Sequence, residues 1–170
     1  FYAPLLASAL GDSVFEGSAK LEEVYAPGAN AIGANAFSGC ANMTSAAFDN
    51  AISVGDGAFY GCEKISTLSL SSAQSLGDAA LHGCTSLGYF SLDAVKSIYL
   101  DSFRDVLPGI TELYLPELEI IHGVEGGMLP SAIESFYAPK LKNIPANTFK
   151  GNGNLCDVVL GSVESIGDYA

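Results

Sequence analysis

Apolar residues recur along this chain at a spacing of about 22 residues, which is far longer than the period of a single helix or strand. Residues 32–40 read IGANAFSGC, residues 54–62 read VGDGAFYGC and residues 76–84 read LGDAALHGC. One such unit is too short to bury its own apolar side, whereas stacked units bury it against one another. Self-similarity at this period is typical of a solenoid.

The large apolar residue of the A-F pair provides an anchor for aligning the repeats. Successive anchors lie 22, 22, 22, 22, 25 and 21 residues apart. Further apolar positions follow six, nine and eleven residues after most anchors, and the last two share one side of a strand because they are two residues apart. The anchors are Phe15, Phe37, Phe59, Leu81, Phe103, Met128 and Phe149.

This alignment predicts one solenoid domain over residues 1–170, with about seven coils and a partial coil in front. We expect an α/β leucine-rich-repeat solenoid in which each coil has one parallel strand and a short helical turn opposite. An Asp three residues before the anchor would cap that turn, and a Gly two residues after the anchor would end it. A second short strand is expected in segments such as VKSI, LKNI and VESI.

The composite pattern I-G-x-x-A-F-x-G-C-x-x-L-x-x-L-x-L resembles the BspA-type leucine-rich repeat of bacterial surface proteins and some parasitic protists. The resemblance covers the whole chain, although the fifth coil lacks the G-C pair and the sixth lacks the A-F pair. It implies a secreted or cell-surface location. It also implies adhesion-type binding of another protein, such as a host matrix or cell-surface protein.

The charge balance limits the classes of partner that the protein is expected to bind. The chain has 19 acidic and 7 basic residues, which gives a net charge of -12. Such a surface repels nucleic acid and anionic lipid, so a protein partner with basic patches is expected instead. No apolar run reaches the roughly 18 residues of a membrane span, so no membrane insertion is expected.

Both ends of the sequence resemble internal boundaries of a longer protein. The opening FYAPLLASALG has the apolar character of a signal peptide, but its spacing already belongs to the repeat. The closing IGDYA stops one residue short of the next anchor. We therefore expect a fragment of a longer protein.

Three cysteines form a column, because Cys40, Cys62 and Cys84 each follow an anchor position by three residues. In stacked coils their Cα atoms would lie about 5 Å apart, which is within disulfide range. A straight ladder does not converge on a tetrahedral metal site. The sequence favours buried free thiols over a disulfide, and Cys156 falls elsewhere in the repeat.

An acidic column lies three residues before the anchors. Helix capping explains it, and a calcium ladder is the alternative, because acidic loops of other parallel solenoids bind calcium. The column has one acid per coil, no D-x-D pairing and an interruption at Ala34, which favours capping. Its members are Asp12, Asp56, Asp78, Glu125 and Asp168.

The sequence contains no motif that is typical of an enzyme's active site. There is no GxSxG, HExxH, P-loop or GxGxxG motif. His82 and His122 have no recurring Cys or acidic partner nearby in the repeat, and His82 is expected at the surface. We predict a non-enzymatic protein without cofactor or metal.

Residues between the buried strand positions point outward, and in a leucine-rich horseshoe such residues line the concave face, which is the candidate partner-binding site. Tyrosine offers large contact area, little rotamer entropy and a hydrogen-bonding tip, although it is also a good strand former. The candidate residues are Glu23, Tyr25, Tyr89, Glu112, Tyr114, Tyr137 and Asp157.

A second candidate is the longer coil from Phe103 to Gly127, which inserts three residues, because repeat proteins often place length variation on a binding face. A tolerated surface insertion is the alternative. For the whole protein, the hypothesis is a recognition module, and the alternative is a passive stalk that holds another domain away from a surface.

Overall fold

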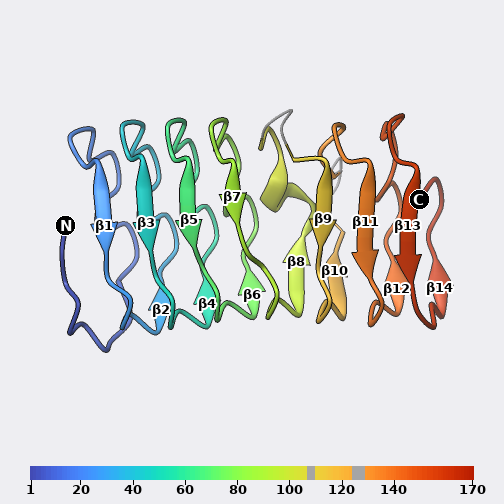
Figure 1. The fold of residues 1–170 in the computed structure, drawn as a ribbon, viewed down its shortest axis with the longest axis horizontal. Coiled ribbons are helices and arrows are strands. Elements are labelled where there is room, and N and C mark those ends of the chain that lie inside the picture. The colour runs from blue at the N-terminus through green and yellow to red at the C-terminus, as the bar shows by residue number, and fades with distance from the viewer. Residues whose placement is uncertain (107–109, 124–128) are drawn as a thin grey trace.

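The computed structural model describes residues 1–106, 110–123 and 129–170. The chain winds as a parallel β-solenoid, with the two termini at opposite ends of the stack (Figure 1). Each regular coil has a strand on one side and a second short strand on the other. The spacing in the sequence therefore predicts the solenoid correctly, and both expected sets of strands are present.

The odd-numbered strands form one side, which we call the odd-strand face. All the pairings within it are parallel, and they define two sheets, β1-β3-β5-β7 and β9-β11-β13. The strands are β1 (Glu23–Tyr25), β3 (Ser45–Ala47), β5 (Thr67–Ser69), β7 (Tyr89–Phe90), β9 (Glu112–Tyr114), β11 (Ser135–Ala138) and β13 (Asp157–Leu160).

The even-numbered strands form the other side. The five strands from β2 to β10 make one parallel sheet, and β12 pairs with β14. The strands are β2 (Ala31–Ile32), β4 (Ser53–Val54), β6 (Ser75–Leu76), β8 (Ser97–Tyr99), β10 (Ile120–His122), β12 (Asn143–Ile144) and β14 (Ser165–Ile166).

Aromatic anchors stack through the core. The Phe37 ring lies 5.4 Å from the Phe15 ring and 5.4 Å from the Phe59 ring, at interplanar angles of 13° and 9°. Phe37 and Phe59 are fully buried, and Phe48 packs at a tilt against both. Because identical positions of successive coils coincide, each ring covers the next and the core is continuous.

The expectation of a short helical turn in each coil is wrong. In the described part of the chain the helical element is one 3₁₀ turn, η1 (Leu100–Phe103). The other coils use tight turns, because the residue two before the anchor has a left-handed φ, as at Asn35 (53°), Ala79 (51°) and Asn147 (63°). A left-handed residue interrupts a right-handed helix. The expected Gly two residues after the anchor does end the turn, with φ +72° at Gly39.

The acidic column joins coils instead of capping helices. The Oδ1 atom of Asp12 accepts a 2.8 Å hydrogen bond from the backbone N–H of Ala34, one coil further on. Asp56 accepts an equivalent 2.8 Å bond from Asp78 N–H. Glu125 lies outside the described residues. Capping is therefore the wrong explanation for these residues, because the turns contain no helix to cap.

The cysteine column consists of free thiols. The Sγ atoms of Cys40, Cys62 and Cys84 donate to backbone carbonyls of the preceding coil at 3.1, 3.2 and 3.2 Å. Burial raises the pKa of all three thiols, to about 12 for Cys84, and the neighbouring Cys84 and Cys40 raise the pKa of Cys62 further. These thiols satisfy buried carbonyls and stay protonated at neutral pH.

Replacing Phe59 with Ala is expected to lower the free energy of unfolding by about 3–5 kcal/mol, because it leaves a cavity in the aromatic stack. Urea denaturation followed by circular dichroism measures this. Ile52→Ala is the control, since Ile52 is 51% exposed and should change stability little. A Phe59→Ala variant as stable as the Ile52→Ala variant would contradict the stacked core.

Iodoacetamide at about pH 8 is expected to alkylate Cys156 and to spare the three column cysteines. Cys156 is exposed, whereas the column thiols are covered and keep their protons, since their pKa is raised above the ordinary value. Mass spectrometry of native and urea-unfolded protein measures the labelling. Four labels should appear after unfolding, and rapid native labelling of Cys62 would contradict the buried ladder.

Candidate functional site

The strand pairings bring the candidate residues into two outward columns on the odd-strand face. In the first sheet Glu23 aligns with Ser45 and Thr67, and Tyr25 aligns with Ala47 and Ser69. In the second sheet, the outer columns are Glu112, Ser135 and Asp157, and Tyr114, Tyr137 and Val159. The structure thus places the candidates on one side of the solenoid, but divides them between two sheets.

Alternation along each strand sends these side chains out of the core. Val24 and Leu113 are buried between exposed neighbours in β1 and β9. Tyr25 is 42% exposed and Tyr114 is 55% exposed. Glu23, Glu112 and Asp157 are also exposed, and Tyr137 is half-buried. Tyr89 begins β7, and its side chain lies outside the described part of the structure.

Two pairs of stacked tyrosines stand on this face. The rings of Tyr114 and Tyr137 lie 4.7 Å apart at 16°, and those of Tyr2 and Tyr25 lie 5.0 Å apart at 14°. Tyr2 is 75% exposed and was not among the predicted residues. A parallel bridge pairs Tyr2 with Tyr25, so Tyr2 extends the odd-strand face by one more position in front of β1. The 22-residue period leads back from Tyr25 to Ala3 instead, so the spacing alone does not find Tyr2.

Small side chains lie beside the first tyrosine pair. Ala47 and Ser69 continue the Tyr25 column, and the Ser69 hydroxyl donates to the Asp49 carboxylate. Together with Tyr2 and Tyr25 they line a depression of about 340 Å³. The face is therefore contoured, with a stacked aromatic pair at the edge of a shallow hollow.

The acidic residues of this face form no ion pair with any residue that the structure describes. None of the ion pairs among the described residues involves Glu23, Glu112 or Asp157. Exposed carboxylates without a partner attract cations from solution or from another molecule. The arrangement is suited to a ligand that combines contact surface with positive charge.

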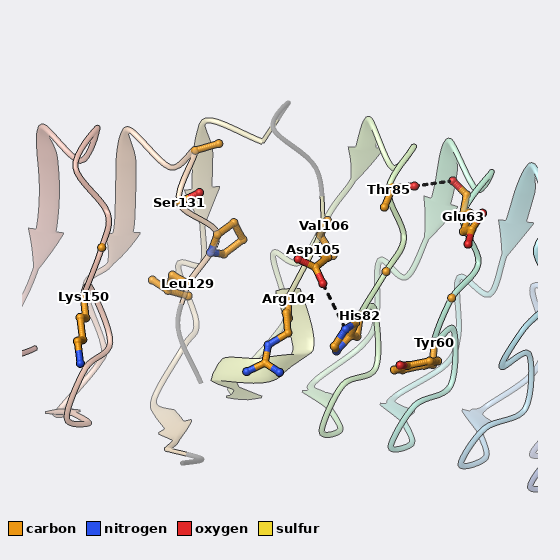
Figure 2. A pocket seen from close by; sticks show the side chains of 15 residues that line it. Tyr60, Glu63, His82, Thr85, Arg104, Asp105, Val106, Leu129, Ser131 and Lys150 are labelled. Carbon is orange, nitrogen blue, oxygen red and sulfur yellow. Dashed lines mark hydrogen bonds and ion pairs between the residues drawn. The ribbon is translucent and has the colours of Figure 1, made fainter. Parts of the chain in front are cut away.

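A cleft of about 860 Å³ opens on the turns, away from the odd-strand face (Figure 2). Tyr60, His82 and Arg104 line it from three successive coils, each one residue after an anchor. Figure 2 shows Leu129, Ser131 and Lys150 on the opposite wall. Its volume exceeds those of two hollows lined by residues of the odd-numbered strands, which are about 450 and about 340 Å³.

His82 and Arg104, which line this cleft, lie close to carboxylates. His82 Nδ1 lies 3.7 Å from Asp101 Oδ2, and His82 Nε2 lies 3.5 Å from Asp105 Oδ2. Arg104 Nε lies 3.0 Å from Asp101 Oδ1. The expectation that His82 is a surface residue without an acidic partner is therefore wrong. Its side chain is 18% exposed, since the next coil covers it and brings both carboxylates.

His122 also has local partners. Its ring stacks on Tyr99 at 4.5 Å, and its Nε2 lies 3.0 Å from the Ser97 hydroxyl. Within the described ranges, no group of three or more His, Cys, Asp or Glu side chains could hold a metal ion. Neither histidine therefore identifies a metal centre. The odd-strand face is the stronger candidate, because its aromatic and charged groups are exposed and its carboxylates lack partners.

The longer coil is described only in part, since residues 107–109 and 124–128 lie outside the described residues. Its described portion contains η1, whose Leu100, Ser102 and Phe103 are buried. The Ser102 hydroxyl donates to Gly77 O at 2.7 Å, much as the cysteine thiols donate in earlier coils. In this coil, Ser102 thus makes the kind of contact that a cysteine makes in the earlier coils.

The profile of the BspA type leucine rich repeat region matches residues 8–123 in six copies, which is more than half of the chain. The chain belongs to this family. The BspA-type resemblance read from the repeated A-F and G-C pairs is thereby confirmed. Leucine-rich repeats of this type are protein-interaction modules of bacterial surface proteins.

Solved structures show the same fold. A leucine-rich-repeat protein of T. pallidum superposes with a TM-score of 0.59 at 23% identity, over 95% of this chain and 66% of that one. A leucine rich cell surface protein of Faecalibacterium prausnitzii A2-165 gives 0.52 at 18% identity, over 94% and 60%. The chain therefore spans less than two thirds of the length of these two proteins. No curated protein matches it.

A membrane crossing was not expected from the sequence. Across residues 1–106, 110–123 and 129–170, no helix has the length and apolar character that a crossing requires.

Proposed function

We propose that this BspA-type domain is a non-enzymatic recognition module of a secreted or cell-surface protein, and that it binds another protein through the odd-strand face. The observation that carries the proposal is the presence of two stacked tyrosine pairs on the odd-strand face, in which Tyr2, Tyr25 and Tyr114 are exposed, beside carboxylates that form no ion pair with the described residues. The family and the surface protein among the structural neighbours support the location.

The tyrosine pairs suit a protein contact for a physical reason. Stacking and strand pairing already hold Tyr25, Tyr114 and Tyr137 in place, so little rotamer freedom is lost when a partner covers them. Each ring offers an apolar body and a hydroxyl that can hydrogen-bond at the rim. The face therefore presents preorganised contact area.

The charge on the face specifies the partner. Glu23, Glu112 and Asp157 lie on the same face as the tyrosines, and the whole chain has a net charge of -12. A partner with basic patches is steered toward such a surface, and salt weakens the attraction. A host matrix or cell-surface protein of this kind fits the adhesion that the family resemblance implies.

A passive stalk is the alternative function. A stalk has no use for exposed aromatic side chains, and an exposed apolar patch usually indicates an interaction site. Tyr2 and Tyr114 are 75% and 55% exposed, which favours recognition over the stalk.

A pull-down from extracellular-matrix and cell-surface protein mixtures, at about 0.15 M and about 0.5 M salt, tests the proposal. The parent is expected to capture a protein, and the Tyr25→Ala, Tyr114→Ala, Tyr137→Ala triple variant is expected to lose it. Binding should weaken at the higher salt concentration, because the carboxylates contribute.

Tyr60→Ala is the matched control, because Tyr60 is 46% exposed but lies on the turn side. It should capture the protein as the parent does. Undiminished capture by the triple variant would rule out the odd-strand face, and capture of nothing by the parent would favour the stalk.

A further inference from the structure

The odd-strand face is interrupted between β7 and β9. The sheets β1-β3-β5-β7 and β9-β11-β13 end there, and no backbone hydrogen bond joins β7 to β9 within the described ranges. On the opposite side of the same coils β6, β8 and β10 stay paired. These coils are thus paired through their even-numbered strands and unpaired between β7 and β9 on the odd-strand face. Figure 1 shows β7 and β9 farther apart than the other neighbouring odd-numbered strands.

The repeat shows which backbone groups lose their partners. Gly88 N–H donates to Ser66 O at 3.2 Å, and Glu134 N–H donates to Thr111 O at 2.7 Å. The equivalent bond at the break would run from Thr111 N–H to Gly88 O, and it is not formed between these two described residues. Among the described residues, these edges of β7 and β9 are therefore not paired with each other, and an unpaired edge is a template for pairing with another chain.

A cleft of about 450 Å³ lies between these edges, and we call it the slot. Leu92 and Leu113 line it and are buried, each 3% exposed. Phe90 also lines it, and its ring lies 6.4 Å from that of Phe103 in η1. The slot thus combines apolar residues at its base with backbone edges along its sides.

The charge of the slot is negative. Asp93 and Glu112 line it and are exposed, and no Lys or Arg lines it among the described residues. Asp93 Oδ2 accepts a 2.8 Å hydrogen bond from the Ser91 hydroxyl. A ligand with a cationic side chain complements this pair of carboxylates.

We propose that the slot binds an extended peptide segment of a protein partner, which enters as an added strand between β7 and β9. Strands pair at about 4.8 Å, so one inserted strand restores the ladder on both sides. β9 is three residues long, and a matching segment spans about 10 Å. This inference rests on the proposed function and specifies how part of the partner is held.

The alternation along β9 defines the segment. A residue aligned with Leu113 points toward the core and should be apolar. Its two neighbours point outward, one beside Glu112 and the other beside Tyr114. A Lys or Arg beside Glu112, followed by an apolar residue and then by a polar or aromatic one, completes the pattern.

A pool of acetylated, amidated heptapeptides tests the inference. The pool alternates polar and apolar positions and has Lys fixed at one outward position, and a matched pool has Glu there. The parent protein, immobilised, is expected to retain peptides of the Lys pool over the Glu pool. If no peptide is retained at a total peptide concentration of about 1 mM, the slot proposal is overturned, because a useful site binds far more tightly than that.

Two glycine variants give a matched comparison. Gly88 lines the slot, and a Cβ built there meets no atom within 4 Å, as is also true of Gly153 elsewhere. Gly88→Ile should therefore fold but obstruct the slot, and Gly153→Ile should fold and bind as the parent does. The retained peptide should bind Gly88→Ile at least about tenfold more weakly. Equal binding to both variants overturns the proposal.

An analogue of the retained peptide, N-methylated at alternate amides, tests the backbone pairing. It keeps the side chains but loses N–H donors, so its affinity should fall about tenfold or more. Equal affinity of the analogue overturns the added-strand geometry. Glu112→Gln should weaken the Lys peptide without unfolding the protein, because the side chain is exposed.

The peptide assay and the pull-down can fail separately. If the pull-down captures a protein through the three tyrosines but the slot retains no peptide, the slot proposal is refuted and the recognition function still stands. If the parent retains a peptide but captures no protein in the pull-down, the slot proposal is supported and the tyrosines are not the determinant of binding.

Discussion

The parallel stacking of successive coils supports every other feature of this structure. The backbone N–H group of each anchor donates to the carbonyl one residue before the next anchor, from Phe15 to Ala36 O, from Phe37 to Ala58 O and from Phe59 to Ala80 O. The rings at these positions lie about 5 Å apart, because parallel pairing sets that spacing. A side chain that suits one coil therefore suits all of them, and the sequence repeats.

The same stacking explains the polar residues of the turns. A turn buried between neighbouring turns must have partners for its backbone groups. Asp12 and Asp56 accept from amides of the next coil, and the thiols of Cys40, Cys62 and Cys84 donate to carbonyls of the preceding one. These residues resemble metal or redox ligands in the sequence, but their contacts in the structure are structural.

The irregular coil relaxes this constraint on one side only. Leu81 replaces the aromatic anchor, and η1 supplies Leu100 and Phe103 to the core after it. The even-numbered strands keep their pairing there, while β7 and β9 separate. In the described part of the chain, the odd-strand face is thus interrupted between β7 and β9, and a cleft lies there.

The sequence by itself determined the period, the buried columns and the outward positions. Strand alternation and a spacing of about 22 residues place Tyr25, Tyr114 and Tyr137 on the odd-strand face without further information. Tyr2 is different, because the same period leads back from Tyr25 to Ala3, and only the bridge between Tyr2 and Tyr25 reveals the pairing.

Only the tertiary structure decided the turns, the role of the acidic column, the partners of His82 and the break between β7 and β9. Each of these depends on contacts between coils rather than within one. Asp12 finds its partner 22 residues away, and Asp101 and Asp105 reach His82 from the following coil. A periodic pattern indicates which positions stack. It does not specify how two unlike coils fit together, because that depends on the shapes of both at once.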